Sequence, residues 1–518
     1  MSYYYDLFLY FGCLLLLLLL LLLAAAIANV FWLSPAATWR RLQRNGFSGP
    51  PPFFPLGNLM EMSKEKTERP SNFLHDIHSS VFPYFSRWRK AYGKVFIYWL
   101  GTEPFLYIAD PEFLKLATSG AMGKKWGKPN VFKLDREPMF GRGLVMLEGD
   151  DWARHKHIVA PAFSAANLKR MIRVMEETTQ KLLEDWSDEV AAGRQEIDVE
   201  KGIAKNAAEI IAQTSFGVGQ EKGKRVFQKL QLLQQMLFRS GRLVGVPFGD
   251  ILCAKKAYDA RRLGKDVDRL LHDIIRSRRQ ENSDSTPGKG HDLLGELLEA
   301  GDRDRRGRKL TARELVDECK TFFFAGHETT ALALSWALLL LALHPEWQSI
   351  LREEIARVSG GRPFDSDMLS KLTKMGWVWN EVLRLYSPAP NVQRQAREEV
   401  RVGDVVVPEG TNMWVDVVGM HHDPELWGDD VNEFRPERFE EDRFYGGCNH
   451  RMGYLPFGFG GRTCVGRNLA AMEFKVVLSL VLRRFLLSVS PANDHAPRIM
   501  LSLRPSCGVR LILHNVED

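Results

Sequence analysis

The longest apolar run of the chain lies at its N-terminus. No charged residue occurs from Leu7 to Leu33, and Leu14 to Leu23 is unbroken leucine. About twenty such residues suffice to cross a bilayer as a helix, so this run predicts an N-terminal transmembrane anchor. The alternative is a cleaved secretory signal with Ala26-Ile27-Ala28 as its site. Asp6 and the absence of Lys and Arg before the run favour an uncleaved anchor instead.

The residues that follow the run predict its orientation. Arg40, Arg41 and Arg44 come next, and the positive-inside rule places them, with everything downstream, in the cytosol. The stretch Phe47 to Pro55 is rich in proline and incompatible with a helix. We therefore expect an anchor over residues 1–34, a basic and proline-rich hinge over 35–55 and one large domain over 56–518.

Beyond the hinge, helical periods of apolar residues outnumber alternating ones. They predict helices over 168–192, 225–238, 254–280 and 293–300. Two hairpins are predicted, one joining 94–100 to 104–108 and one joining 405–407 to 413–418. The polar stretches 281–290 and 301–309 predict surface loops. The chain is therefore predicted to be mainly α with a minor β-sheet region.

One predicted helix is much longer than the others. Thr311 to Glu314 fits a capping box, and the pattern ends at His344, before a proline. The helix is then about 50 Å long at roughly 1.5 Å per residue. Only a helix running through the core stays as apolar as this one does from Phe322 to Leu343. In its middle, Thr329 can bond a backbone carbonyl and open the helix locally, although an ordinary core threonine fits the same residues.

A glycine-dense loop near the C-terminus places one cysteine in a constrained setting. Between Phe457 and Gly466, three glycines in four positions let the backbone fold sharply and lie close to a flat partner. The helical pattern of Val465 to Phe485 then puts Cys464 at a helix N-terminus, where free N–H groups favour an anionic sulfur. Arg462 adds positive charge nearby. These features indicate a thiolate ready to bind a haem iron, a ligand that favours O–O cleavage.

Two alternatives apply to this cysteine. It can be a small buried side chain, as most free cysteines are. It can also be a zinc ligand, since Cys448 and His450 precede it, but Cys464 lacks the second close ligand that zinc motifs show. The six cysteines of the chain are scattered without paired spacing, which argues against a disulfide framework and favours a reducing compartment.

The cysteine loop resembles a known family. Phe457, Gly460, Arg462, Cys464 and Gly466 match the pattern Phe-x-x-Gly-x-Arg-x-Cys-x-Gly, which is similar to the haem-ligand loop of the cytochrome P-450 monooxygenases. The resemblance implies the cytochrome P-450 fold, with residues 56–518 as a single haem domain. It also implies haem b as the cofactor, Cys464 as the iron ligand, and Phe457 and Gly466 among the cofactor-binding residues.

The middle of the long helix resembles the same family. Ala325-Gly326-His327-Glu328-Thr329 is similar to its oxygen-binding groove. This resemblance implies that Thr329 and Glu328 are catalytic and deliver protons to the distal oxygen, because the O–O bond breaks heterolytically only when the outer atom leaves as water.

A charged pair in apolar surroundings adds a third motif. Glu381 and Arg384 lie three apart on one predicted helix face, and a buried pair needs further partners. With Arg438 they resemble the family's Glu-Arg-Arg triad. The implied role is structural: the triad would hold the loop that carries Cys464.

Several residues are candidates for the two haem propionates, which guanidinium groups bind well. Arg462 lies in the cysteine loop, and Arg394 is placed like a propionate-binding arginine of the family. Trp152 and Lys156 match its Trp-x-x-x-Arg helix, with Lys where Arg is usual. The single ammonium group of Lys156 therefore replaces a guanidinium, which could form two parallel hydrogen bonds to a carboxylate. For each cation, a solvated surface charge is the competing interpretation.

The charge balance excludes one class of partner and suggests another. The net charge is +6 with acids and bases interleaved, so nucleic-acid binding is not indicated. No obligate oligomer is expected. Five basic residues near the haem-binding elements would suit an acidic redox partner if they share a face, although they also fit a merely soluble surface: Arg154, Lys156, Arg451, Arg467 and Lys475.

The resemblance, which runs from the anchor to the C-terminus, implies a membrane-anchored monooxygenase of the endoplasmic reticulum. It would hydroxylate a small lipophilic substrate with O2, taking electrons from NADPH through cytochrome P-450 reductase, and membrane lipid would surround its anchor. Residues 93–113, 152–163 and 434–439 resemble plant microsomal enzymes of the 72 clan, and within it the 715 family. Relatives in that clan act on hormones such as gibberellins, cytokinins and brassinosteroids, or on fatty acids and terpenoids.

Two other functions stay open on the sequence alone. One is a haem-thiolate isomerase or dehydratase that needs no external electrons. Such enzymes usually differ from the family pattern at the acid–alcohol pair, whereas this chain has that pair as Glu328 and Thr329. The other is a haem-binding protein without catalysis. In all cases the distal pocket is expected to be lined by parts of 124–146, 322–329 and 387–392.

Overall fold

The computed structural model describes residues 2–64, 75–217, 220–238, 243–284, 292–303 and 309–516. Helices make up most of them, and the sheets are small, so the predicted fold class is confirmed. The buried side chains form one large core around the long central helix and a second core around the main sheet. The cysteine loop lies between these two cores, because its aromatic residues pack on both: Phe457 on the first and Phe459 on the second.

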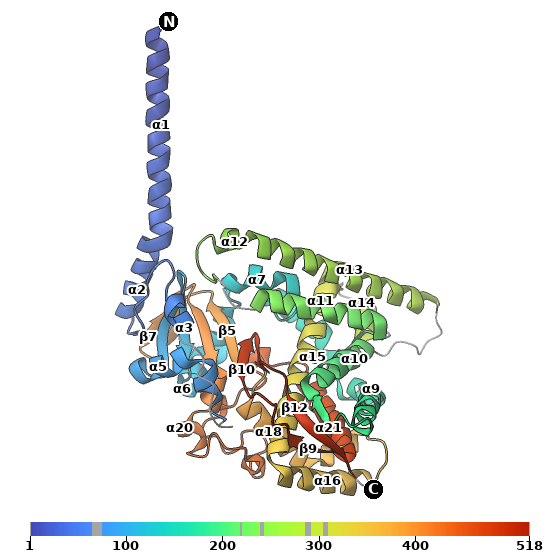
Figure 1. The fold of residues 1–518 in the computed structure, drawn as a ribbon. Helices are drawn as coiled ribbons and strands as arrows, with labels where there is room; N and C mark the ends of the chain where they lie inside the picture. The colour runs from blue at the N-terminus through green and yellow to red at the C-terminus, as the bar shows by residue number, and fades with distance from the viewer. Residues whose placement is uncertain are drawn as a thin grey trace.

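The long predicted helix is α15, Ala312–Leu343 (Figure 1). Its N-cap, Thr311, accepts from the backbone N–H of Glu314, and the Glu314 carboxylate accepts from the Thr311 N–H, as the capping box predicts. The helix ends at its C-cap His344. At Gly326 it is approached closely by Ile211 of α10 (Val199–Phe216): a Cβ on Gly326 would lie 2.7 Å from the Ile211 Cδ1. This glycine therefore lets α10 pack tightly against α15.

The main sheet has the order β1-β2-β8-β5-β3. Its first hairpin joins β1 (Val95–Leu100) to β2 (Glu103–Ile108) and confirms the prediction for 94–108. The next strands are β8 (Asn412–Asp416), which runs parallel to β2, and β5 (Asn391–Ala396), which runs antiparallel to β8. β3 (Trp126–Gly127) forms the edge.

The second predicted hairpin is wrong. β7 (Val405–Val407) pairs with β6 (Val400–Val402), whereas β8 crosses to the main sheet and lies between β2 and β5. The reason is burial: four of the five residues of β8 are buried, which suits the centre of a sheet better than one arm of a two-stranded ribbon.

The other predicted helices are present with shifted ends. They are α9 (Ala165–Ala191), α11 (Gln220–Phe238), α13 (Ala254–Asp284) and α14 (Leu293–Arg303). The predicted loops at 281–290 and 301–309 are therefore shorter than expected, since α13 and α14 extend into them. Residues 285–291 and 304–308 lie outside the described part of the chain.

The remaining elements are short, apart from the helices α8, α16, α18 and α21 that frame the cysteine loop and the core. Their bounds are α3 (Leu59–Lys64), α4 (Ile77–Val81), α5 (Pro83–Tyr92), α6 (Pro111–Thr118), α7 (Asn130–Phe140), α8 (Gly149–Val159), α12 (Gly249–Leu252), α16 (Pro345–Ser359), α17 (Ser366–Lys371), α18 (Thr373–Leu385), α19 (Val417–His421), α20 (Pro424–Trp427), α21 (Arg467–Arg484), β4 (Glu196–Asp198), β9 (Phe485–Val489), β10 (Pro497–Met500), β11 (Ser502–Pro505) and β12 (Arg510–Asn515).

The N-terminal apolar run is a helix that projects from the globule (Figure 1). α1 (Ser2–Ala28) continues through a π-helical turn (Asn29–Leu33) into α2 (Ser34–Arg44). By length and composition, two helices of the described residues are apolar enough to cross a membrane: this one and α15. Because α15 is largely buried in the core, α1 is the candidate span.

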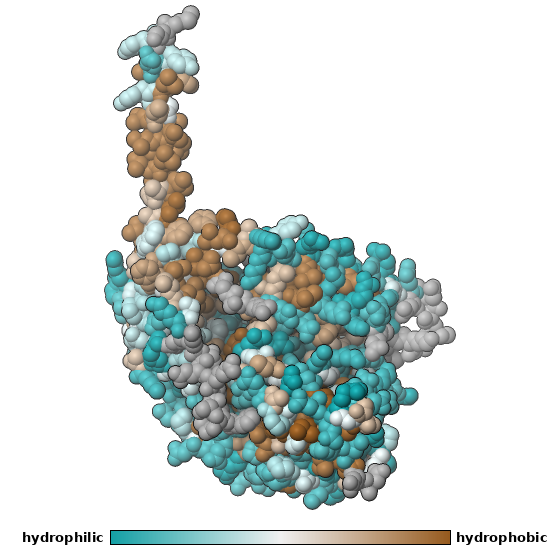
Figure 2. Space-filling view, viewed as in Figure 1, coloured by the Kyte–Doolittle hydropathy of each residue, from teal (hydrophilic) through white to brown (hydrophobic). Residues whose placement is uncertain are grey.

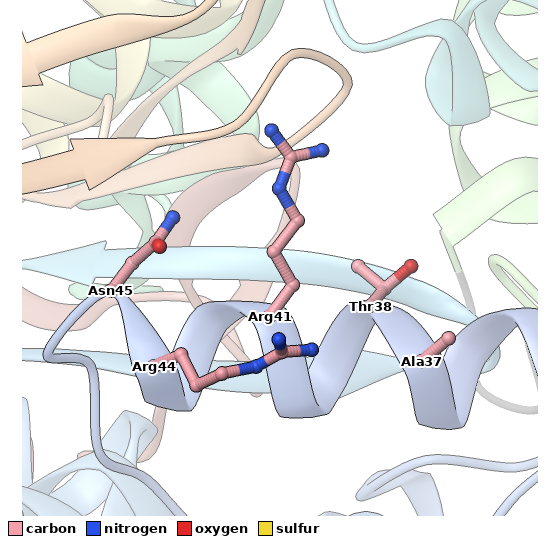
Figure 3. Close-up of a pocket in the computed structure, with 5 residues that line it drawn as sticks. All are labelled: Ala37, Thr38, Arg41, Arg44 and Asn45. Atoms are coloured by element: carbon pink, nitrogen blue, oxygen red, sulfur yellow. The ribbon is translucent and has the colours of Figure 1, made fainter.

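The segment after α2 is folded against the globule. The Ile97 N–H of β1 donates to the Ser48 carbonyl at 2.9 Å, and the Phe54 ring packs edge-on against Trp99 with ring centroids 4.9 Å apart. α2 itself borders a shallow hollow lined by Ala37, Thr38, Arg41, Arg44 and Asn45 (Figure 3). The proline-rich stretch therefore packs along β1, and α2 lies beside the hairpin of β6 and β7.

Apolar side chains gather where α1 meets the globule. Figure 2 shows brown atoms along α1 and on the adjoining edge of the globule, whereas the rest of this face is largely teal. The exposed residues there include Phe248, Ile251 and Leu252 beside α12, and the Phe248 ring stacks on Phe31 with centroids 6.0 Å apart. A monomeric soluble surface rarely exposes such a cluster.

Candidate active site at the Cys464 loop

The backbone of the glycine-dense loop is folded back on itself. Gly458 and Gly460 have φ of 73° and 63°, values at which a side chain is strained. The Cys464 N–H donates to the Phe457 carbonyl at 3.0 Å, which closes the loop. The glycines thus bring Phe457 and Cys464 together at one wall of a cavity.

The exposed side chain of Cys464 lines that cavity. The backbone N–H groups of Gly466 and Arg467 donate to its sulfur, as the start of a helix provides. α21 begins at Arg467 with Gly466 as its N-cap, so Cys464 lies just before the helix. Burial raises the pKa of the thiol despite these donors, and a bound metal ion would reverse that by stabilising the thiolate.

The cavity has a volume of about 730 Å³ and extends from the cysteine loop to α15. All three predicted segments contribute to its walls, through residues within 128–146, 321–330 and 388–393. The lining is mainly apolar, and aromatic residues are frequent: Phe132, Phe140, Phe163, Phe322, Phe324 and Phe457. This is the shape and chemistry of a site for a small lipophilic molecule.

Thr329 and Glu328 lie in the wall of the cavity formed by α15. The Thr329 hydroxyl donates to the Ala325 carbonyl at 2.8 Å, the local bond that the sequence predicts. The Glu328 carboxylate accepts from Gln234 Nε2 and Ser502 Oγ, both at 2.7 Å, and Arg504 Nη1 lies 3.9 Å away. Glu328 is therefore anchored to α11 and β11, with a guanidinium behind it.

Two of the predicted propionate ligands are arginines of the cavity wall, one buried and one half-buried. Arg394 is 7 % exposed, and its Nη1 donates to the Gln393 carbonyl at 2.8 Å. Burial and the nearby charge of Arg462 lower the pKa of Arg394 to about 10, and burial lowers the pKa of Arg462 to about 10 as well. A nearby anion would therefore stabilise the charged form of both arginines.

Trp152 and Lys156 contact the same loop from α8. The Arg462 guanidinium lies 4.6 Å from the centre of the Trp152 ring, and Lys156 Nζ lies 5.0 Å from it. Lys156 Nζ also donates to the Gly461 carbonyl at 2.6 Å. In this structure Lys156 thus contacts the backbone of the cysteine loop.

Lys128 is a site residue that the sequence reasoning missed. It lines the cavity, and burial together with the charges of Arg394 and Arg462 holds its pKa well below the usual value. The nearby Glu148 carboxylate already binds Lys133 and Arg397, at 2.6 and 2.9 Å. A lysine in a polar stretch gives no periodic signal, so only its place beside Trp126 could have drawn attention to it.

These cations fit haem b. Arg394, Arg462 and Lys128 converge on one cavity that also contains a cysteine sulfur, and they disfavour one another's charge. Two propionates would supply the missing negative charge, and the thiolate would supply the iron ligand. Arg394, Arg462, Lys128 and Cys464 are thus the residues that would hold the group.

The predicted triad is present, and its members Glu381 and Arg384 are fully buried. Arg384 donates to both Glu381 carboxylate oxygens, at 2.7 and 2.8 Å, and Arg438 Nε lies 3.4 Å from Glu381. Arg384 also donates to the carbonyls of His421 and Val431, at 3.0 and 2.6 Å. The triad therefore fixes the segment that runs from α19 towards the cysteine loop.

His421 connects the triad to the loop. Its Nδ1 lies 3.2 Å from the Arg384 carbonyl, and its Nε2 accepts from the Leu455 N–H at 2.9 Å. Burial lowers the pKa of His421 to about 3, so the ring stays neutral and can accept through Nε2. Leu455 lies two residues before Phe457, so the triad positions the start of the loop.

Two predictions about charged surfaces are corrected by the structure. Lys475 Nζ donates to the carbonyls of Leu369 and Leu372, at 2.8 and 3.0 Å, and Arg154 pairs with Glu314. Neither cation is free for a partner, because each already has internal ligands. The exposed members of the predicted basic face are Arg451 and Arg467, with Lys156 half-buried.

The proposed zinc ligands are also otherwise engaged. Cys448 donates to the His450 carbonyl at 3.3 Å, and His450 Nε2 lies 3.0 Å from a Glu112 carboxylate oxygen. Within the described ranges, no group of three or more His, Cys, Asp or Glu residues could hold a metal ion.

Comparisons with known proteins agree with this geometry. The family model described as Cytochrome P450 matches residues 49–510. A cytokinin hydroxylase of Arabidopsis thaliana is 38 % identical over 494 residues, which cover 93 % of this chain and 94 % of the relative. Cytochrome P450 714B3 of Zea mays is 35 % identical over 508 residues, covering 95 % and 93 %. Cytochrome P450 734A1 of Arabidopsis thaliana is 33 % identical over 506 residues, covering 95 % of each chain.

Proposed function

Because this chain belongs to the cytochrome P450 family, and is therefore a monooxygenase that uses haem b, we propose that it hydroxylates a small lipophilic plant hormone, terpenoid or fatty acid. Electrons come from NADPH through cytochrome P-450 reductase. The observation that carries the proposal is the apolar cavity of about 730 Å³ that joins Cys464 to Thr329. Relatives named as cytokinin hydroxylases support a hormone substrate.

Haem b supplies the activation of dioxygen, in which O2, two electrons, two protons and the substrate C–H bond give an alcohol and water. The chain's own residues bind the cofactor and orient the substrate. Cys464 would hold the cofactor, and Arg394 and Arg462 would bind its carboxylates. The apolar walls exclude water and place the substrate beside α15.

The test is a metabolite screen of microsomes that contain the full chain and the reductase. We expect NADPH-dependent consumption of at least one of the cytokinins, gibberellins, diterpenes or fatty acids offered, with a product heavier by one oxygen atom. Microsomes with the reductase alone are the control. A product that forms equally without NADPH, or that gains no oxygen, would contradict the proposal.

We propose that Thr329 and Glu328 supply protons to the reacting oxygen. The Thr329 hydroxyl lines the cavity and donates to the Ala325 carbonyl, which holds it in the wall where it can relay a proton without a large movement. Glu328 is held by Gln234 and by Arg504, which in turn lies 3.2 Å from Glu200. This row of polar groups leads away from the cavity towards a half-buried carboxylate.

Thr329→Ala is expected to uncouple the reaction while the protein keeps its haem. The product formed per NADPH should fall by about tenfold or more, a smaller effect than the roughly 100- to 10,000-fold that a positioned proton donor contributes to a rate, and hydrogen peroxide should rise in proportion. The matched control is Ser335→Ala. Ser335 makes the same bond to a carbonyl four residues earlier, at 2.8 Å, but it is not part of the cavity wall. Unchanged coupling in Thr329→Ala, or equal loss in both variants, would refute the relay.

We propose that residues 1–34 are a single-pass anchor in the endoplasmic reticulum membrane, that 35–55 attach it to the globule, and that 56–518 are the cytosolic haem domain. The exposed apolar residues at α12 lie at the foot of α1 (Figures 1 and 2), so they would reach the same bilayer surface. The side chains of Ile251 and Leu252 are 70 % and 73 % exposed, and burying each in lipid gains roughly 1.5–3 kcal/mol.

This second contact predicts that a chain lacking residues 2–34 still binds membranes. Changing Ile251 and Leu252 to Asn in that shortened chain should lower its partition onto phospholipid vesicles by more than about tenfold, measured by flotation. Leu486→Asn is the control, since Leu486 is 45 % exposed on β9, at the other side of the globule. Equal partition of all three proteins would show that α12 does not touch the bilayer.

A further inference from the structure

One cation of the cavity has no role in the site described above. Arg136 lies on α7 and lines the cavity with Phe132, over whose ring its guanidinium lies 4.2 Å from the centroid. Its Nη2 donates to the Gln393 Oε1 at 2.8 Å. The Nε of Arg136 is buried and has no hydrogen-bond partner among the described residues.

No carboxylate of the described residues neutralises this arginine. Among the residues that the structure describes, none lies within the 4.0 Å of a salt bridge to the Arg136 guanidinium. Burial lowers the pKa of Arg136 to about 10, so the group is still charged at neutral pH, at a cost that an anion would relieve. A half-buried charge with a buried free donor is a typical feature of a ligand site.

Arg136 is separated from the arginines that would hold the haem propionates. It bonds to the side chain of Gln393, and successive side chains of a strand point to opposite faces. Gln393 and Arg394 are neighbours on β5, so Arg136 lies on the other face of that strand from Arg394. The charge of Arg462 lowers the pKa of Arg394 and that of Arg136 does not, although Arg136 does contribute to the lowered pKa of Lys128.

The surroundings of Arg136 are polar at one point and apolar elsewhere. Gln393 also donates to the Asn391 side chain at 2.8 Å, so Arg136, Gln393 and Asn391 form a small polar cluster in the cavity wall. The residues that continue the wall towards α15 are apolar, among them Phe140, Met146 and Phe324. A ligand that is complementary to this wall is lipophilic and carries one oxyanion.

We propose that Arg136 binds an oxyanion of the substrate, a carboxylate or a phosphate, through its free Nε–H and a neighbouring N–H, and so orients a lipophilic acid in the cavity. Guanidinium presents two parallel donors that match these anions. This inference rests on the proposed function and narrows its substrate class. Arg136 is a binding and orienting residue in it, and has no part in proton transfer.

The probes are ω-(imidazol-1-yl)alkanoic acids of graded chain length, their methyl esters and the matching phosphonates. The imidazole binds haem iron and shifts the Soret band, so the dissociation constant is read without knowing the natural substrate. In the full-length holoenzyme we expect, at the best chain length, an acid or phosphonate to bind at least about tenfold more tightly than the ester. Which anion binds more tightly distinguishes carboxylate from phosphate.

Arg136→Leu should abolish this preference and leave the ester affinity within about twofold, whereas Arg136→Lys should keep part of it. The matched control is Arg142→Leu, because Arg142 is on the loop after α7 with a side chain that is 77 % exposed; it should keep the full preference. Haem content and the carbon monoxide spectrum of each variant are measured in parallel.

Three results would overturn the inference. The first is equal binding of acid and ester by the holoenzyme at every chain length. The second is an equal loss of the preference in Arg142→Leu and Arg136→Leu. The third is loss of haem from Arg136→Leu, which would make Arg136 a propionate ligand instead. If the wild-type chain bound no haem at all, the proposed function would fail first, and its colourless preparation would show this before any probe is added.

Discussion

Cys464→Ser is expected to remove the red-shifted Soret band that reduced, carbon monoxide-treated preparations of the wild-type chain should show. That band reports a thiolate on the iron, and a serine hydroxyl would not be ionised at the same position. Product formation should fall by at least about a hundredfold, since loss of an outer-shell partner alone costs 10- to 100-fold and here the direct ligand is lost. The measurements are the difference spectrum, the haem content and turnover with reductase.

The control for this variant is Cys448→Ser. Cys448 lies in the segment before the loop, is half-buried, and has a thiol whose pKa burial raises to about 11, so it is not prepared as a ligand. It should keep both the band and turnover. A wild-type spectrum in Cys464→Ser, or loss of the band in Cys448→Ser, would show that the sulfur on the iron has been misassigned.

Arg384→Ala is expected to destabilise the fold by roughly 3–5 kcal/mol, the cost of breaking a fully buried pair. Both Arg384 and Glu381 have no exposed surface, so the remaining Glu381 charge stays in the core with Arg438 at 3.4 Å. The variant also frees the carbonyls of His421 and Val431. We therefore expect a melting temperature several degrees lower and a loss of haem on mild warming, because His421 no longer fixes Leu455.

Arg173→Ala is the control for charge removal. Arg173 pairs with Glu177 on α9 at 2.7 Å with a side chain that is 85 % exposed, and such pairs contribute little. Its melting temperature should match the wild type. If Arg384→Ala melted like Arg173→Ala, the triad would not stabilise the fold, and if it melted early but kept its haem, the link through His421 would be wrong.

The sequence predicted those parts of the fold whose signals are local. The ends of α15 follow from a capping box at Thr311 and a proline after His344, both within one turn of the residues they terminate. The partner of β8 could not be predicted in this way. Its neighbours β2 and β5 include one strand some three hundred residues earlier, as the pair Phe105 and Asn412 shows, and alternation of apolar residues does not specify a partner.

The residues of the candidate site also differ in whether a local sequence signal marks them. Cys464 and Thr329 stand out because glycines and small residues surround them within one short segment, and the structure places both on one cavity. Lys128 and Arg136 have no such signal. Their importance comes from their place in the cavity wall, which the tertiary fold supplies, so in the sequence they look like ordinary surface cations.

The helical connection between α1 and α2 has a mechanical consequence. The helix continues through its π-helical turn to Arg44, and α2 contacts the β6–β7 hairpin through the hydrogen bond of Asn45 to the Val406 carbonyl at 2.9 Å and the exposed pair of Arg41 and Glu399 at 3.3 Å. A continuous helix is stiff along its axis, so a movement of one end also moves the other end. If α1 is the membrane anchor proposed above, a change in its tilt would therefore rotate the globule with it, and a thicker or thinner bilayer would change the orientation of the globule relative to the membrane.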